Sequence, residues 1–222
     1  MGDPAMLRRR LAEVNPLFGL RVRTPRLTIE MPVDPDLLEL LEVIEAGVHD
    51  PSWMPFRHAW TDVPKLERER DSLAHWWRLR ALWSPENWTW CGAVRVDDHL
   101  VGVQALMAAG YPALREVSTA SWLGMRHQGL GLGKEMRAAI LHLAFEGLGA
   151  TRAHSGYVEG NEASKRVSES FGYVFNGSSS RIIRGEVRRE VNVVLDRSTW
   201  GRLRRDDVVV EGLEACLELF GA

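Results

Sequence analysis

The stretch SWLGMRHQGLGLGKEMRAAILHLAF, residues 121–145, places Gly129, Gly131 and Gly133 at alternate positions between an apolar run and a helix-like repeat. Apolar residues and glycines then recur at helical spacing as far as Gly147, which predicts a helix that begins inside the glycine run. The first N–H groups of a helix lack internal partners, and its dipole is positive there. Glycines let an anion approach those amides. The stretch therefore predicts a phosphate or pyrophosphate site; a glycine-rich helix entry without a ligand is the structural alternative.

The spacing separates this loop from two other phosphate-binding loops. A nucleotide P-loop needs Ser or Thr after Gly-Lys, whereas Glu135 follows Lys134 here. A dinucleotide-binding fingerprint needs G-x-G-x-x-G, whereas this run is G-x-G-x-G. The segment QGLGLG instead fits the pattern Q/R-x-x-G-x-G/A through Gln128, Gly131 and Gly133.

Composition limits the class of protein. The chain has 222 residues, 45% of them apolar and 26% charged, with a formal net charge of −2, as expected for one globular domain. Basic residues are mixed with acidic ones, so we expect no nucleic-acid partner. No apolar run approaches the ~20 residues of a membrane span, so we expect no membrane partner. The two cysteines, Cys91 and Cys216, are too few for a disulfide framework and predict reduced thiols in a cytoplasmic protein.

Strand-like and helix-like segments follow one another in a mixed α/β order. Asp97-Asp98 predicts a hairpin turn, Gly47 a helix end and Asp62 a helix N-cap. The predicted strands are 26–31, 87–96, 99–108, 116–124, 151–158, 173–177 and 186–195. The predicted helices are 34–47, 62–83, 133–147 and 161–172. This order predicts an N-terminal arm (1–22), one domain (23–200) and a C-terminal extension (201–222) that packs on the domain or is exchanged with it.

The glycine loop and its surroundings resemble the coenzyme A loop of the GNAT superfamily of N-acyltransferases. SWLG before the loop, NEASKRVSESFGYV after it, RTPRLTIEMP near the start and Trp200 are similar to the branch typified by ribosomal-protein N-terminal acetyltransferases. The resemblance covers residues 23–200 in order and is most specific from Glu116 to Tyr173. It implies an α/β (α+β) fold with a twisted mixed sheet of about six to seven strands and flanking helices. The sheet would splay open between the strands at 116–124 and 151–158, where acyl-CoA would lie.

The resemblance also implies a set of cofactor-binding residues. Asn161, Ser164 and Ser168 share one helix face, and the position of Asn161 by itself predicts an N-cap. In the family such an asparagine also bonds the pantetheine or phosphate portion of CoA. The expected CoA-binding residues are Trp122, Leu123, Gln128, Gly129, Leu130, Gly131, Leu132, Gly133, Lys134, Asn161 and Ser164. No metal is expected.

The implied reaction is attack of an amine on the thioester carbonyl, followed by departure of the CoA thiolate. The resemblance offers the backbone N–H of Leu123 as the donor to the oxyanion. Many family members place a tyrosine seven residues after the helix asparagine, to protonate the thiolate; here Ser168 holds that position. They also often carry a glutamate where Ser118 aligns, so Glu116 is the candidate base, acting through a water. Surface roles for Ser168 and Glu116, the latter paired with Arg115 or another arginine, are the structural alternatives.

The acceptor side is less defined. Seven of the nine tryptophans lie between Trp53 and Trp90, where they form an acceptor pocket or, the simpler interpretation, core and a homodimer interface. The acceptor would be a small-molecule amine or a protein N-terminus. Acetyl-CoA is the default donor; a succinyl group would need a cation such as Arg57, Lys65 or Arg80. Because the family tyrosine is missing and the glutamate is displaced, a non-catalytic acyl-CoA-binding regulator is the alternative function.

Overall fold

The computed structural model describes residues 3–222, which form one nine-stranded mixed sheet flanked by helices. The strands lie in the order β7-β8-β6-β5-β4-β3-β2-β1-β9. Their bounds are β1 Arg21–Arg23, β2 Thr28–Glu30, β3 Asn87–Val96, β4 His99–Ala109, β5 Glu116–Leu123, β6 Arg152–Val158, β7 Val174–Ile183, β8 Glu186–Asp196 and β9 Val209–Glu211. The fold class predicted from the sequence is confirmed, with more strands than expected.

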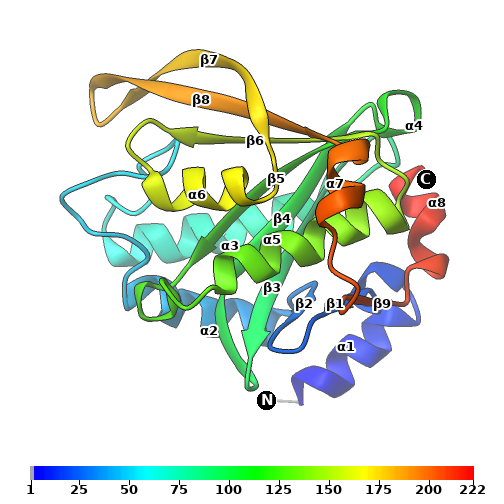
Figure 1. Cartoon of the computed structure of the whole chain (residues 1–222). Coiled ribbons are helices and arrows are strands. Elements are labelled where there is room, and N and C mark those ends of the chain that lie inside the picture. Colours follow the sequence, from blue (N-terminus) through cyan, green and yellow to red (C-terminus); the bar gives the residue numbers. More distant parts are fainter. Residues whose placement is uncertain (1–2) are drawn as a thin grey trace.

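Helices cover both faces of the sheet (Figure 1). α5 and α6 lie on one face, over the larger hydrophobic core, and α2 and α3 lie on the other, over a second cluster. The helices are α1 Pro4–Ala12, α2 Asp34–Glu45, α3 Lys65–Ala81, α4 Tyr111–Leu114, α5 Leu132–His142, α6 Glu162–Ser170, α7 Arg197–Leu203 and α8 Leu217–Phe220. Short 3-10 turns occur at Pro16–Phe18, Met125–His127 and Glu214–Cys216, and one π turn, Leu143–Gly147, extends α5.

The sheet opens between β5 and β6, its one parallel strand pair. The two strands are in register only from Glu116↔Arg152 to Ser118↔His154, and beyond that rung they separate. β6 stays paired with β8 along its whole length, and β5 stays paired with β4. Ala120 and Ser121, in the middle of β5, are consequently exposed. The predicted splay is therefore present, with its closed end at Ser118 and His154.

Local sequence signals account for most element boundaries. Asp97 and Asp98 both adopt positive φ, as a two-residue hairpin turn requires, and Gly47 ends α2 with a φ of 102°. Asp62 is not an N-cap: α3 begins three residues later, and the Asp62 carboxylate instead accepts two hydrogen bonds from Arg184 in the β7–β8 turn, at 2.7 and 2.8 Å. A distant arginine thus outcompetes the local backbone for this carboxylate.

Both ends of the chain are built into the sheet. β1 pairs with β2 and also with β9, so the boundary expected between Val22 and Arg23 falls inside a strand. Near the C-terminus, Cys216 and Phe220 are fully buried in the larger core. β1 and β9 have three residues each, too few for an alternating pattern to reveal them.

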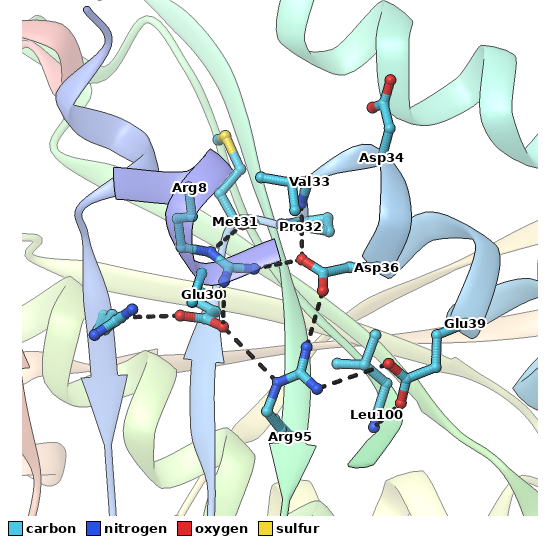
Figure 2. Close-up of polar contacts among 12 residues, drawn as sticks. Arg8, Glu30, Met31, Pro32, Val33, Asp34, Asp36, Glu39, Arg95 and Leu100 are labelled. Atoms are coloured by element: carbon cyan, nitrogen blue, oxygen red, sulfur yellow. Dashed lines mark hydrogen bonds and ion pairs between the residues drawn. The ribbon is translucent and has the colours of Figure 1, made fainter. Parts of the chain in front are cut away.

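A buried ion network fixes α1 to the sheet (Figure 2). The Arg8 guanidinium lies 3.1 Å from Glu30 on β2 and also pairs with Asp36 on α2. Arg95 on β3 pairs with the other Asp36 oxygen at 2.9 Å, and the Asp36 carboxylate accepts a hydrogen bond from the Val33 N–H at the start of α2. Arg8, Glu30 and Asp36 are each at most 5% exposed. The N-terminal helix is therefore part of the folded unit.

Candidate acyl-CoA site

The glycine loop follows β5 directly and ends at α5. A 3-10 turn over Met125–His127 leads to Gly129 and Gly131, whose φ angles are 77° and 81°. Gly131 is the N-cap residue of α5, which confirms that the helix begins inside the glycine run. Glycine is needed at 129 and 131 because L-residues rarely adopt such φ values. Gly133 lies inside the helix and has no such restriction.

The loop presents a row of open backbone amides. Within residues 3–222, the N–H groups of Gly129, Leu130 and Gly131 have no backbone acceptor, and no side chain caps α5. Leu132 and Gly133 occupy the first two helical positions, whose N–H groups have no partner inside a helix. Hydrogen bonding resumes with Lys134 and Glu135, which both donate to the Gly131 carbonyl. The Lys134 side chain is exposed beside this row. The arrangement suits an anion that accepts several hydrogen bonds.

Two polar side chains hold this loop in place. The Gln128 Nε2 donates to the carbonyls of Leu123 and Val48, both at 2.9 Å, so this side chain supports the loop through both of its N–H groups. On the other side, Arg26 donates from Nη1 to the Leu130 carbonyl at 3.0 Å and from Nε to Glu135 at 2.6 Å. Burial raises the pKa of Glu135, but hydrogen bonds from Thr24 and Arg26 outweigh it and leave that pKa below its ordinary value.

The unpaired edge of β5 adjoins the loop. The Gly124 N–H donates to Val101 and the Trp122 carbonyl also points towards β4. Because successive residues of a strand direct their backbone groups to opposite edges, Ser121 and Leu123 direct theirs into the opening. Trp122 directs its side chain to the α2–α3 face, where its ring centroid lies 6.2 Å from that of Trp60. The edge can therefore pair with an extended ligand that contains amides.

The polar face of α6 lies against the body of the domain. The Asn161 Oδ1 accepts a hydrogen bond from the Ser164 N–H at 3.0 Å, which confirms its N-cap position. Ser168 is only 2% exposed, and its hydroxyl donates to the Ser164 carbonyl at 3.1 Å. Its proton therefore already has an acceptor in this structure, and the expected role of Ser168 in protonating the thiolate stays a prediction. Ala163 is exposed, so the buried face of α6 is shifted from the apolar stripe expected from the sequence.

Glu116 and Leu123 stand at opposite ends of β5. They are seven residue steps apart along the strand, about 23 Å, so one thioester cannot contact both. The Glu116 carboxylate lies 2.8 Å from His154 Nε2 and 3.5 Å from Arg152 at the closed end of the opening. The ion-pair alternative for Glu116 is thus present, with Arg152 in place of Arg115.

The loop between α2 and α3 covers the other face of the opening. Phe56 lies between His49 and Trp60, with ring centroids at 5.5 and 5.3 Å, and Trp53 packs by Gly160 at the end of β6. The remaining five clustered tryptophans divide between core and surface: Trp76, Trp88 and Trp90 are buried, Trp83 is half-buried against the larger core, and Trp77 is exposed. Aromatic side chains thus lie on this face, and three of the clustered tryptophans belong to the core; an acceptor pocket here stays a prediction.

Three cations are considered as partners for the distal carboxylate of a succinyl group, and each of them already has an acidic partner in the protein. Arg57 pairs with the buried Glu190. Arg80 pairs with Asp34 at 2.9 Å. Lys65 lies within 4 Å of two glutamates on α2 and α3.

One charged residue near the opening was not singled out by sequence reasoning. Arg137, on α5, is 3% exposed, and its Nη1 lies 3.2 Å from the hydroxyl of Ser155 on β6. Its position four residues after Gly133 and three before Ile140, on the buried helix stripe, is the signal that could have identified it.

None of the described helices is long and apolar enough to cross a membrane. Within residues 3–222, no three His, Cys, Asp or Glu side chains gather as metal ligands would.

Comparison with known proteins agrees with this geometry. A family model described as an acetyltransferase (GNAT) domain matches residues 26–174. Similar solved structures include RimJ of Mycobacterium smegmatis in complex with CoA-disulfide, at 16% identity and a TM-score of 0.67, covering 89% of this chain and 91% of that one.

Two further structures have the same fold. A GCN5-related N-acetyltransferase from Brucella melitensis is 19% identical, with a TM-score of 0.66 and coverage of 83% of this chain and 81% of that one. A ribosomal-protein-S5-alanine acetyltransferase from Vibrio fischeri is 14% identical, with a TM-score of 0.63 and coverage of 81% and 98%. With the family model spanning both the glycine loop and the opening in the sheet, the chain belongs to the GNAT family of acetyltransferases.

Proposed function

We propose that this protein transfers an acetyl group from acetyl-CoA to a primary amine, by direct attack of the amine within a ternary complex. The observation that carries the proposal is the row of open amides at residues 129–133 beside the unpaired edge of β5. The amides would receive the pyrophosphate, and the strand edge would pair with the amides of the pantetheine arm.

The length of the pantetheine arm determines which backbone N–H of β5 would donate to the oxyanion. The amide row lies beside Leu123, because a Cβ built at Gly133 would be 3.9 Å from Leu123 Cδ1. An extended pantetheine arm spans several strand residues, so its thioester would lie beyond Leu123, towards the closed end of the opening. Ser121 is the next residue whose N–H points into the opening, and it is exposed. We therefore place the oxyanion at the N–H of Ser121, which replaces the assignment to Leu123.

The acceptor would enter from the face lined by Phe56, Trp60 and Trp122. An α-amine, with a pKa of about 8, is partly neutral near pH 7 and needs little help from a base. A protein N-terminus is the acceptor we favour, because proteins of similar fold include ribosomal-protein acetyltransferases. A small-molecule amine is the other candidate acceptor.

The test is release of CoA thiol from acetyl-CoA and succinyl-CoA over a panel of N-terminal peptides and small amines. We expect acceptor-dependent release with acetyl-CoA. CoA binding without release on any acceptor would favour the alternative function, a regulator that binds acyl-CoA. Release of CoA thiol from succinyl-CoA but not from acetyl-CoA would mean that the transferred group is succinyl, with the same proposed mechanism.

Substitution of Ser168 by alanine tests the catalytic role considered for this residue. Because its hydroxyl is buried and bonded to Ser164, we expect Ser168→Ala to change kcat for acetyl transfer by less than about threefold, whereas general-acid help is worth ~100-fold or more. The measurement is kcat with one amine under conditions where chemistry limits the rate. A fall of tenfold or more would restore Ser168 as the proton donor.

A further inference from the structure

Arg137 is a buried cation without a counter-ion. It is 3% exposed, and within residues 3–222 no carboxylate lies within ion-pairing distance of it. Its Nη1 contacts the Ser155 hydroxyl, its Cζ lies 5.9 Å from the centroid of the Tyr173 ring, and its Nε has no hydrogen-bond partner. An arginine keeps its charge in proteins, and an uncompensated buried charge is costly. Such a site is therefore suited to an anion that arrives with a ligand.

The guanidinium lies at the closed end of the opening in the sheet. His154 is the last residue of β6 that pairs with β5, and Ser155 follows it. Ser118 is the last residue of β5 that pairs with β6, and Thr119 follows it. The Thr119 hydroxyl donates to the His154 carbonyl at 3.4 Å, across that end. Ser121, the proposed oxyanion donor, is two residues from Thr119, about 7 Å along the strand. Arg137 thus lies at the same end of the opening as the proposed thioester position.

Tyr173 and the neighbouring side chains of β5 and β6 around Arg137 are uncharged. Burial raises the pKa of Tyr173, partly offset by the charge of Arg137 and by the Thr119 and Arg137 side chains, so the phenol stays protonated at neutral pH. Its hydroxyl lies near the Thr119 and Arg137 side chains, but it makes no hydrogen bond of normal geometry within the described chain. The β5 and β6 side chains on this face of the sheet are Val117, Thr119, Ser121, Ala153, Ser155 and Tyr157. The charge of Arg137 is therefore not neutralised from either strand.

We propose that Arg137 binds the sulfur of CoA and stabilises it as a thiolate. This inference rests on the proposed function. The amine nitrogen bonds to the carbonyl carbon, and one C=O electron pair moves onto oxygen to form the oxyanion. When this pair re-forms the carbonyl, the C–S bond breaks and its electron pair stays on sulfur, while the proton lost by the amine goes to solvent. The positive charge of Arg137 offsets the charge that develops on sulfur, and no protein group has to donate a proton. Arg137 would thus stabilise the leaving thiolate, which Ser168 cannot protonate while its hydroxyl is bonded to Ser164.

The test uses free CoA and the whole chain. Thiolate absorbance of bound CoA is titrated against pH, and desulfo-CoA, which lacks the thiol, provides the baseline. We expect the pKa of the bound thiol to be lowered by about one unit or more relative to free CoA, as an opposite charge nearby produces. Arg137→Met should abolish this shift, Arg137→Lys should keep part of it, and Arg166→Met, at an exposed site on α6, should leave it unchanged.

This experiment distinguishes a purely structural role of Arg137 from the proposed role in binding the thiolate. A structural arginine would give no thiol shift in the unmodified protein, or the same shift in Arg137→Met, and either result overturns the proposal. If Arg137→Met does not fold, Arg137→Lys and the unmodified protein still decide the question. If CoA and desulfo-CoA both fail to bind the unmodified protein, the proposed function itself fails, which is a distinguishable outcome.

Discussion

Replacement of Gly131 by glutamate is expected to weaken CoA binding by on the order of 100-fold or more, which corresponds to about 3 kcal/mol. The backbone φ of 81° at this position disfavours any L-residue, and the new carboxylate would repel the pyrophosphate. A Cβ at Gly131 would also lie 3.4 Å from Arg26 Nη2, so the new side chain would crowd the arginine that bonds the Leu130 carbonyl and holds the loop. Calorimetric titration with CoA gives the affinity, and circular dichroism checks that the fold is kept.

Gly185, in the β7–β8 turn, provides a matched control. Its φ of 78° is similar, and nothing lies within 4 Å of a Cβ built there. Gly185→Glu therefore adds the same backbone strain and the same charge at a distance from the loop, and should retain CoA affinity. Equal affinity of Gly131→Glu and Gly185→Glu for CoA would refute the pyrophosphate assignment.

Substitution of Arg8 by methionine is expected to lower the free energy of unfolding by about 3–5 kcal/mol, the usual cost of removing one partner from a buried ion pair. The variant leaves Glu30 and Asp36 buried without Arg8. Arg95 would then be the cation that both carboxylates share, because Arg21 contacts Glu30 but not Asp36. Urea unfolding measures this change. It also tests whether the N-terminal helix belongs to the cooperative unit.

Arg10 on the same helix provides the comparison. Its pair with Glu13 is exposed, with side-chain accessibilities of 73% and 56%, so Arg10→Met should change the unfolding free energy by less than about 1 kcal/mol. If both variants unfold at the same urea concentration as the unmodified protein, α1 is a detachable arm and the network in Figure 2 contributes nothing to stability.

The glycine loop could be predicted because its signals are local. Glycine spacing, the helical repeat behind it and the Asn161 N-cap each depend on a few neighbouring residues, and all lie where the sequence placed them. The alternating strands and the Asp97-Asp98 turn are local signals as well. These features determine where the opening and the amide row are formed.

The features that could not be predicted depend on long-range contacts. β1 and β9 are defined by their pairing across almost the whole chain. Asp62 has the sequence context of an N-cap, but Arg184 binds its carboxylate. The proposed assignment of Ser121 needs the distance between the amide row and β5. Arg137 becomes notable only because no acidic residue of the described range 3–222 forms an ion pair with it.

The most direct test of the account is calorimetric titration of the unmodified protein with CoA, NAD and ATP under identical conditions. The open amides at residues 129–133 adjoin an unpaired strand edge, so the site should favour a pyrophosphate with a pantetheine arm over one attached to a nicotinamide or a γ-phosphate. We predict that CoA binds far more tightly than NAD or ATP. Equal or tighter binding of either nucleotide would contradict the assignment of the loop and the opening as an acyl-CoA site.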